Sequence, residues 1–455
     1  MRAHNPVAVV LIKNARLVDP EAGIDGRRDV LVASGRVVLV SERISPDEAR
    51  RTPERAEGTD PLLLIEGDGL WLWPGLVDAH VHFREPGFTH KETIRTGSMA
   101  AAAGGYTSVI CEPNTDPPID SIELVRRLAK KARAESVVNV YFKAAMTEGR
   151  HGAKPTDVAA LAQHESVAAL SDDGDPVVDP AVMEDVCREA ARADIPVAPH
   201  CEDSPAALQK RAAGVLSGFE PDAPYTNEAN YVKRDLELAA RAGCRIHFSH
   251  VSLARTADII EQFRTTRNGA PAATFEVTPH HLLLCTGDFA QGEVPGVNPP
   301  LRSAQDRDAL QHALSSGEVD AIASDHAPHT AEDKARGASG LIGLETTLGL
   351  VLSHFVGEGK LSVSDAVRLL SASPARIFGL PAGTLRPGAR ADMTLIDPRL
   401  SWTVNAEEFR SRSRNTPFGG WQLRGKAVAT FAGGEEVYAD PAFELRKTLW
   451  EARRS

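Results

Sequence analysis

Residues 76–84 read Leu-Val-Asp-Ala-His-Val-His-Phe-Arg, and this stretch begins the pattern that decides the fold. Its apolar part predicts a buried β-strand, and a segment with helical spacing of apolar residues follows it. The same alternation continues to about residue 380. Because eight parallel strand-helix units close naturally into a barrel, the sequence predicts an α/β fold with a (β/α)8 TIM-type barrel. The eight apolar runs lie at 76–83, 106–111, 138–146, 167–171, 196–200, 245–250, 273–278 and 319–324.

Both ends of the chain have a different pattern. Short β-branched runs alternate with turn signals before residue 72, and β character returns after residue 381, around the Gly433-Gly434 turn. We therefore expect one composite β-sandwich domain, formed by residues 1–72 and 381–455, beside a catalytic barrel formed by residues 73–380. The polar stretch 45–60 has no apolar period, which predicts an exposed loop.

Composition and charge exclude several classes of protein. Hydrophobic residues make up 42% and charged residues 25%, as in a globular enzyme. The formal net charge of -11, without a long Lys/Arg run, argues against a nucleic-acid partner and favours small molecules. The apolar run 7–12 is too short to cross a membrane, and five scattered cysteines form no disulfide pattern. We expect a cytoplasmic protein with reduced thiols.

Polar side chains stand where several of the predicted strands end, which is where catalytic groups of such barrels lie. His80 and His82 are two residues apart and therefore share one face of a strand, whereas His200, His250 and Asp325 end three further strands. Each residue alone has an ordinary structural explanation, as a packed histidine or a helix cap. Together, four imidazoles and a carboxylate at one barrel mouth indicate a metal site of the kind that suits zinc.

Spacing leaves other candidates open. It does not separate Asp172 from its neighbour Asp173, and both are also compatible with a turn. Cys201 and His247 point away from the predicted site if their strands alternate regularly, which favours packing roles for both. The pair His280-His281 has no evident partner.

Several motifs resemble those of the dihydroorotases in the amidohydrolase superfamily, and they extend from the first predicted barrel strand to the last. The first is followed closely by Lys91-Glu92. The motifs are His80-Val81-His82-Phe83-Arg84-Glu85-Pro86-Gly87, Pro113-Asn114-Thr115, Ser171-Asp172-Asp173-Gly174, His200-Cys201-Glu202-Asp203, Asn298-Pro299-Pro300-Leu301-Arg302 and Ser324-Asp325-His326-Ala327-Pro328-His329.

The resemblance implies two zinc ions per subunit. His80 and His82 would bind the first, His200 and His250 the second, Asp173 would bridge them, and Asp325 would contact the first metal and act as the catalytic base. The implied reaction is the reversible hydrolysis of (S)-dihydroorotate to N-carbamoyl-L-aspartate in pyrimidine biosynthesis, by a binuclear zinc hydroxide mechanism. The residues implied to hold the substrate are Arg84, Asn114, Asn298, His329, Ser339 and Gly340.

Two alternatives share this pattern. Hydantoinases and allantoinases have the same barrel, but they usually bridge their metals with a carbamylated lysine from strand four, and residues 167–173 contain no lysine. The second alternative is an inactive scaffold for aspartate carbamoyltransferase, although such chains commonly lose metal ligands and this one retains all six. We also expect a homodimer, and the resemblance allows aspartate carbamoyltransferase as a partner of the active enzyme.

Overall fold

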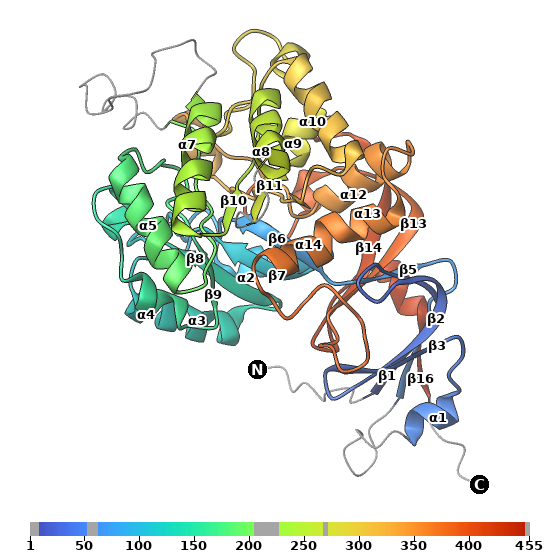
Figure 1. Cartoon of the computed structure of the whole chain (residues 1–455). Coiled ribbons are helices and arrows are strands. Elements are labelled where there is room, and N and C mark those ends of the chain that lie inside the picture. Colours follow the sequence, from blue (N-terminus) through green and yellow to red (C-terminus); the bar gives the residue numbers. More distant parts are fainter. Residues whose placement is uncertain (1–8, 52–61, 204–226, 267–271, 451–455) are drawn as a thin grey trace.

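The computed structural model describes residues 9–51, 62–203, 227–266 and 272–450 (Figure 1). Parallel strands form two ladders, which isolated parallel bridges connect. Val197 pairs with both Leu170 and Ile246, and Val81 pairs with His326. The pairings therefore run through eight positions and return to the first strand, which confirms the predicted α/β barrel. The ladders are β6 (Leu76–Val81), β7 (Tyr106–Cys111), β8 (Asn139–Ala144) and β9 (Val167–Leu170), then β10 (Ile246–Phe248), β11 (Ala273–Val277) and β12 (Ala321–Ile322).

Two predicted strands are shorter than expected. The run at 196–200 pairs only through Val197, because Pro196 and Pro199 have no amide hydrogen to donate to a ladder. The run at 319–324 is reduced to β12, and the amide of Ser324 donates to the Asp78 carboxylate, 3.1 Å away, instead of to a strand. Both departures lie close to the strand ends that carry the candidate site.

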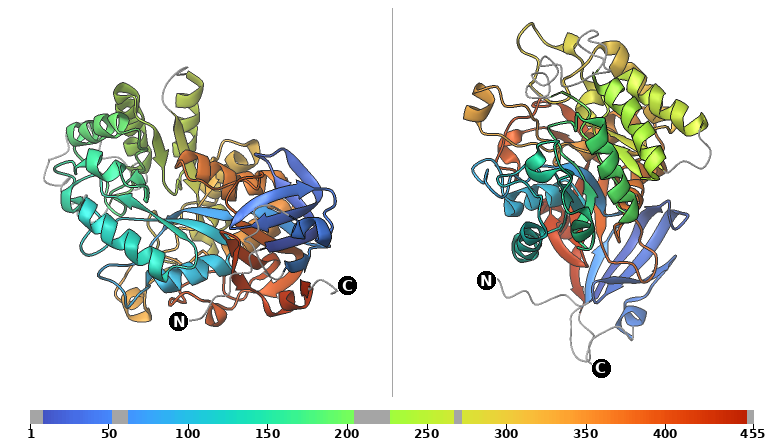
Figure 2. Two further views of the ribbon diagram at one scale, coloured as in Figure 1. Left: turned by 90° about the horizontal axis from the view of Figure 1, so that it is seen from below. Right: turned by 60° about the vertical axis from the view of Figure 1, so that its left-hand side comes forward.

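Helices surround these strands (Figure 2). Helix α3 shows how a helix packs against the strands, because its buried residues recur at helical spacing and face the core. They include Val125, Leu128, Ala129 and Ala132. The longer helices are α2 (Ile94–Ala103), α3 (Ile122–Glu135), α5 (Pro180–Arg192), α7 (Asn227–Ala242), α8 (Ala254–Thr266) and α10 (Ala304–Ser316). The short ones are α4 (Val158–Ala162), α9 (Pro279–Leu283), α11 (Ala331–Ala335), α12 (Thr347–Val351), α13 (Val363–Val367) and α14 (Ser373–Ile377), with π-helical turns at Leu352–Val356 and Arg368–Ala372.

Strands from both parts of the chain outside the barrel meet in one mixed sheet of nine strands, as the composite β domain requires. Leu395 pairs with Leu72, and Leu449 pairs with Leu63. Alternate residues of β1, the first strand of this sheet, pack into two cores, with Ile12 in one and Leu11 in the other. The strands are β1 (Val9–Asp19), β2 (Ile24–Ala33), β3 (Arg36–Ser41), β4 (Leu62–Glu66), β5 (Trp71–Pro74), β13 (Met393–Thr403), β14 (Gln422–Ala432), β15 (Glu435–Ala439) and β16 (Lys447–Trp450).

The predicted loop at 45–60 contains a helical turn, α1 (Pro46–Arg50), so that part of the prediction is wrong. Ser45 and Glu48 form a reciprocal capping box, and Ala49 is buried in the core of the β domain. One buried alanine in a single turn produces no apolar period, which explains the error. Residues 52–60 lie outside the described part of the chain, and the domain boundaries stay predictions.

Among the helices that the structure describes, none is both long and apolar enough to cross a membrane.

Candidate functional site

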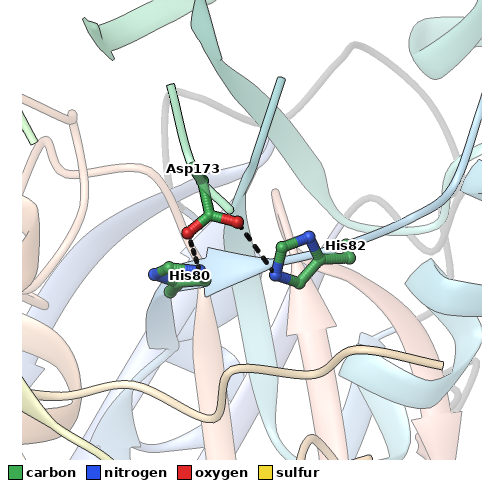
Figure 3. A group of neighbouring side chains, drawn as sticks. All are labelled: His80, His82 and Asp173. Atoms are coloured by element: carbon green, nitrogen blue, oxygen red, sulfur yellow. Dashed lines mark ion pairs between the residues drawn. The ribbon is translucent and has the colours of Figure 1, made fainter. Parts of the chain in front are cut away.

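Three of the predicted residues meet where β6 ends (Figure 3). The Asp173 carboxylate, beyond the end of β9, faces both imidazoles of the His-X-His pair. Its Oδ1 lies 3.4 Å from His80 Nε2, and its Oδ2 lies 3.7 Å from His82 Nε2. All three side chains are at least 95% buried. One ligand atom from each lies within 4.8 Å of the others, which is close enough for one metal ion to contact all three.

A second group of three contains the same carboxylate. Asp173 Oδ1 is 3.3 Å from His200 Nδ1 and 3.4 Å from His250 Nε2, and these two nitrogens are 3.1 Å apart. The barrel thus brings four predicted imidazoles around one carboxylate, and Asp173 belongs to both groups. This is the arrangement that a bridge between two metal ions requires.

Asp325 completes the cluster from the end of the last strand. Its Oδ1 lies 3.1 Å from His82 Nε2 and 3.7 Å from His80 Nε2. Asp325 has a φ of 45°, His250 of 39° and Arg84 of 58°, values that residues other than glycine rarely adopt. The chain therefore keeps strained backbone at three predicted site residues, as is frequent at functional sites.

The chemistry of this cluster fits a metal. His80 Nε2 is buried and makes no hydrogen bond within the described residues, although it points towards two carboxylates. Burial opposes ionisation of Asp173, but the nearby His80, His200 and His250 outweigh it and hold the pKa of Asp173 well below its usual range. An ionised carboxylate surrounded by imidazole nitrogens is a donor set that suits zinc.

Asp172 has a different environment from its neighbour. Its Oδ1 accepts hydrogen bonds from the amides of Met146, at 2.8 Å, and Thr147, at 3.2 Å, and the Thr147 hydroxyl donates to Oδ2. Burial raises the pKa of Asp172 to about 6 despite these bonds. Asp172 therefore holds the loop after β8, and it is absent from both ligand groups found among the described residues.

A buried polar network behind His80 was missed from sequence. Glu276 on β11 accepts from His80 Nδ1 at 3.1 Å and from His247 Nε2 at 3.1 Å. Glu112 lies 3.5 Å from His80 Nδ1 and pairs closely with Lys143, which is completely buried on β8. Carboxylates in this position orient metal-binding histidines. The sequence feature that could have indicated this network is Lys143, a charged residue within the apolar run 138–146.

Two predicted substrate residues contact the ligand cluster directly. Asn114 Oδ1 is 2.9 Å from His82 Nδ1, and its amide nitrogen donates to Asp173 Oδ2 at 2.8 Å. Asn298 Nδ2 is 3.1 Å from His200 Nε2. Both asparagines therefore border the two ligand groups, one on each side.

The other predicted substrate residues lie beside the cluster. Arg84 Nε donates to the carbonyl of Pro328 at 3.2 Å, and its Nη2 is 3.1 Å from His329 Nε2. Burial lowers the pKa of Arg84 to about 10, which leaves the guanidinium charged at neutral pH. A buried cation beside a candidate metal site is suited to hold an anionic group of a ligand.

The loop that contains Ser339 and Gly340 is pinned next to His329. Lys334 donates from Nζ to the carbonyls of Gly296, Ala338 and Gly340, at 3.0, 2.8 and 3.0 Å. Gly340 has a φ of +144°, and a Cβ there would lie 2.7 Å from the Ala327 carbonyl oxygen. Only glycine fits this close approach.

Comparisons with known proteins show which family the chain belongs to. The family model described as amidohydrolase family matches residues 71–437. The chain is 39% identical to the dihydroorotase of Citrifermentans bemidjiense over 442 residues, which is 94% of this chain and 99% of the relative. It is 36% identical to the dihydroorotase of Aquifex aeolicus over 438 residues, 95% of this chain and 99% of the relative.

Solved structures show the same fold. The L-hydantoinase from Arthrobacter aurescens has a TM-score of 0.80 at 27% identity and covers 94% of this chain and 96% of its own. A dihydropyrimidinase from Brevibacillus agri has the same TM-score at 23% identity and covers 95% of both chains. With a family model that spans most of the chain and relatives above one-third identity over nearly all of it, the chain belongs to the amidohydrolase family, among its dihydroorotases.

Proposed function

We propose that this protein is a dihydroorotase, which hydrolyses (S)-dihydroorotate reversibly to N-carbamoyl-L-aspartate and so serves pyrimidine synthesis. The observation that carries the proposal is the position of Asp173, which belongs to both ligand groups where lysine-bridged relatives would need a lysine. Residues 167–173 contain none. The similarity to dihydroorotases over 94% of the chain supports the same substrate.

The proposed cofactor is a pair of zinc ions. His80 and His82 would hold one, His200 and His250 the other, with Asp173 between them. Zinc in such a site supplies an acidified water as nucleophile and polarises the amide carbonyl of the ring. The network of Glu276, Glu112 and Lys143 would keep His80 oriented, with its Nδ1 hydrogen on Glu276 and its Nε2 free to coordinate.

Asp325 is the proposed base. Burial opposes its ionisation, but His82 and His80 outweigh this effect and hold the pKa of Asp325 below its usual value, so the carboxylate is ionised and can accept a proton. In the hydrolytic direction it takes a proton from the attacking water. It then gives that proton to the ring nitrogen as the C–N bond breaks, which releases N-carbamoyl-L-aspartate. The reverse sequence closes the ring and releases water.

Arg84 and His329 are proposed to hold the ring carboxylate of the substrate. A guanidinium can donate two parallel hydrogen bonds to a carboxylate. Asn114 and Asn298 border the two metal positions, where their amides can contact ring oxygens and nitrogens. The backbone of Ser339 and Gly340 would close over the ring from the side of His329.

A hydantoinase activity is the second candidate, because the L-hydantoinase from Arthrobacter aurescens has the same fold at 27% identity. Hydantoin carries no carboxylate, so the charged Arg84 favours dihydroorotate. The test is steady-state turnover of dihydroorotate, hydantoin and allantoin by one zinc-loaded preparation. We expect turnover of dihydroorotate at least about a hundredfold above the other two. Preferred turnover of hydantoin or allantoin would assign the other activity, and no turnover of any ring would favour a scaffold.

The homodimer, an association with aspartate carbamoyltransferase and a cytoplasmic location remain predictions. Light scattering of the purified chain, with and without a bacterial aspartate carbamoyltransferase, tests the first two. A doubled mass for the chain alone supports the dimer, and a larger mass only in the mixture supports the complex.

A further inference from the structure

Arg302 is a buried cation that connects two loops behind the second ligand group. Its side chain is 3% exposed. The guanidinium uses separate nitrogens for separate partners: Nε donates to Ser252 Oγ at 2.9 Å, and Nη2 donates to Glu202 Oε2. Nη2 also lies 3.5 Å from Oε2 of Glu228, a buried residue in the first turn of α7. One side chain therefore joins three segments that are distant in sequence.

Two of these partners stand next to ligand histidines in the chain. Glu202 comes two residues after His200, and Ser252 comes two residues after His250. The ring nitrogens Nδ1 of His200 and Nε2 of His250 are 3.1 Å apart. A shift of either loop would change the separation of these two ligand atoms, so the contacts of Arg302 with both loops bear directly on the geometry of the second group.

The backbone at His250 depends on the same network. Its φ of 39° is one that a residue other than glycine keeps only where its surroundings hold it. The Glu228 carboxylate holds the chain just after it, because it accepts from the amides of Ser252, at 3.2 Å, and Leu253, at 3.1 Å, and from the Ser252 hydroxyl. Arg302 contacts both that hydroxyl and that carboxylate.

A guanidinium suits this position better than an ammonium. The planar group offers donors in fixed directions, whereas a lysine offers one nitrogen on a flexible chain. One lysine nitrogen cannot take the place of both Nε and Nη2, which contact different residues. Arg302 also brings Glu202 and Glu228 to a single cation, and a buried carboxylate that loses its cation is costly.

We propose that Arg302 is a positioning residue for the second metal position. It holds the loops after His200 and His250 at the separation that one ion requires, and thereby sets the affinity of that position. The first ligand group has a different support, since Glu276 orients His80. The inference rests on the proposed pair of metal ions, but not on the identity of the ring that the enzyme opens.

Arg264 offers a matched control at the opposite end of the barrel. Its Nε donates to the Ala273 carbonyl at 2.8 Å, its Nη1 to the Glu318 carbonyl at 2.8 Å, and its Nη2 to Asp320. Ala273 begins β11, and Asp320 precedes β12, so Arg264 joins the amino ends of these strands. That end of a barrel serves stability, whereas the active site lies at the carboxyl ends.

The test makes the same substitution at both arginines and measures zinc binding by the metal-stripped proteins. Competition with a chromophoric chelator gives the two zinc affinities, and anomalous X-ray diffraction at limiting zinc shows which position empties. In Arg302→Lys we expect the weaker zinc step to lose about tenfold to a hundredfold in affinity, with the other step unchanged. The emptied position should be the one at His200 and His250. Arg264→Lys should lower the melting temperature and leave both zinc steps unchanged.

Ser252→Ala removes one contact of Arg302 without leaving a buried charge unpaired, and it should weaken the same zinc step to a smaller extent. This variant provides the test if Arg302→Lys does not fold. Wild-type zinc affinities in the folded variant would overturn the proposal. Equal weakening of both steps, the same weakening in Arg264→Lys, or loss of zinc from His80 and His82 would also overturn it.

Zinc binding is measured without substrate, so the two proposals can fail separately. A wild type that binds two zinc ions and does not hydrolyse dihydroorotate would refute the proposed function alone. A wild type that hydrolyses dihydroorotate, with an Arg302→Lys variant that binds zinc equally well, would refute the role of Arg302 alone.

Discussion

Replacing Asp173 with Asn should remove the bridge between the two proposed metal positions while keeping the size of the side chain. The Asp173 oxygens lie 3.3 to 3.7 Å from nitrogens of His80, His82, His200 and His250. An ion coordinated by these nitrogens at about 2 Å would therefore also lie next to the carboxylate.

The magnitude follows from the lost charge. Two unit charges about 4 Å apart interact by about 4 kcal/mol at an effective dielectric constant near 20, and a divalent ion increases this value. Asparagine keeps a neutral oxygen ligand, so part of the interaction remains. We expect the second zinc ion to bind at least about a thousandfold more weakly, which corresponds to a loss of about 4 kcal/mol.

The assay is zinc titration of metal-stripped protein in competition with a chromophoric chelator, supported by elemental analysis. Asp172→Asn is the matched control, because Asp172 binds the amides of Met146 and Thr147 and belongs to neither ligand group. It should keep both zinc ions with affinity within about tenfold of the wild type. Wild-type zinc affinity in Asp173→Asn, or loss of zinc only in Asp172→Asn, would refute the assignment of the bridge.

Three further substitutions test other parts of the site and the fold. Arg84→Lys keeps the positive charge but loses the two parallel donors of the guanidinium. KM for dihydroorotate should therefore rise by about tenfold or more with zinc content unchanged, and an unaltered KM would count against a contact between Arg84 and the substrate carboxylate. Asp325→Asn should retain most of the zinc while kcat falls at least about a hundredfold, and near-normal kcat would place the base elsewhere. Burial raises the pKa of Glu345 to about 7, well above that of an unfolded glutamate, so its stabilisation is complete at low pH and is lost as pH rises through about 7. Thermal unfolding should therefore show Glu345→Gln gaining stability relative to the wild type between about pH 4.5 and 7, and curves that are parallel over this range would contradict it.

The features that were predictable from sequence depend on local spacing. The two-residue separation of His80 and His82 places both imidazoles on one side of a strand end, and the structure keeps them there. The alternation of strands and helices in the barrel was equally predictable, because each barrel strand contains a similar short apolar run. The composite β domain followed from β character on both sides of the barrel, and the pairing of Leu395 with Leu72 bears it out.

What was missed depends on contacts between residues distant in sequence. Glu276 and Glu112 acquire their roles only when the barrel brings them to His80, which is 196 residues from Glu276. Lys143 lies in an otherwise apolar strand, and its role becomes evident only from its ion pair with Glu112. Lys91 was visible as part of a motif, but its contact with His329 spans 238 residues and could not be read from spacing.

The measurement that tests the central claim most directly is recovery of dihydroorotate hydrolysis when zinc is returned to the stripped protein in bicarbonate-free buffer. A carboxylate bridge is ionised at neutral pH and needs no carbon dioxide to assemble, unlike a carbamylated lysine. Activity should rise to a plateau at about two equivalents of zinc and reach the same level with bicarbonate present. No recovery of dihydroorotate hydrolysis, or recovery only after bicarbonate is added, would contradict a dihydroorotase whose metals are joined by Asp173.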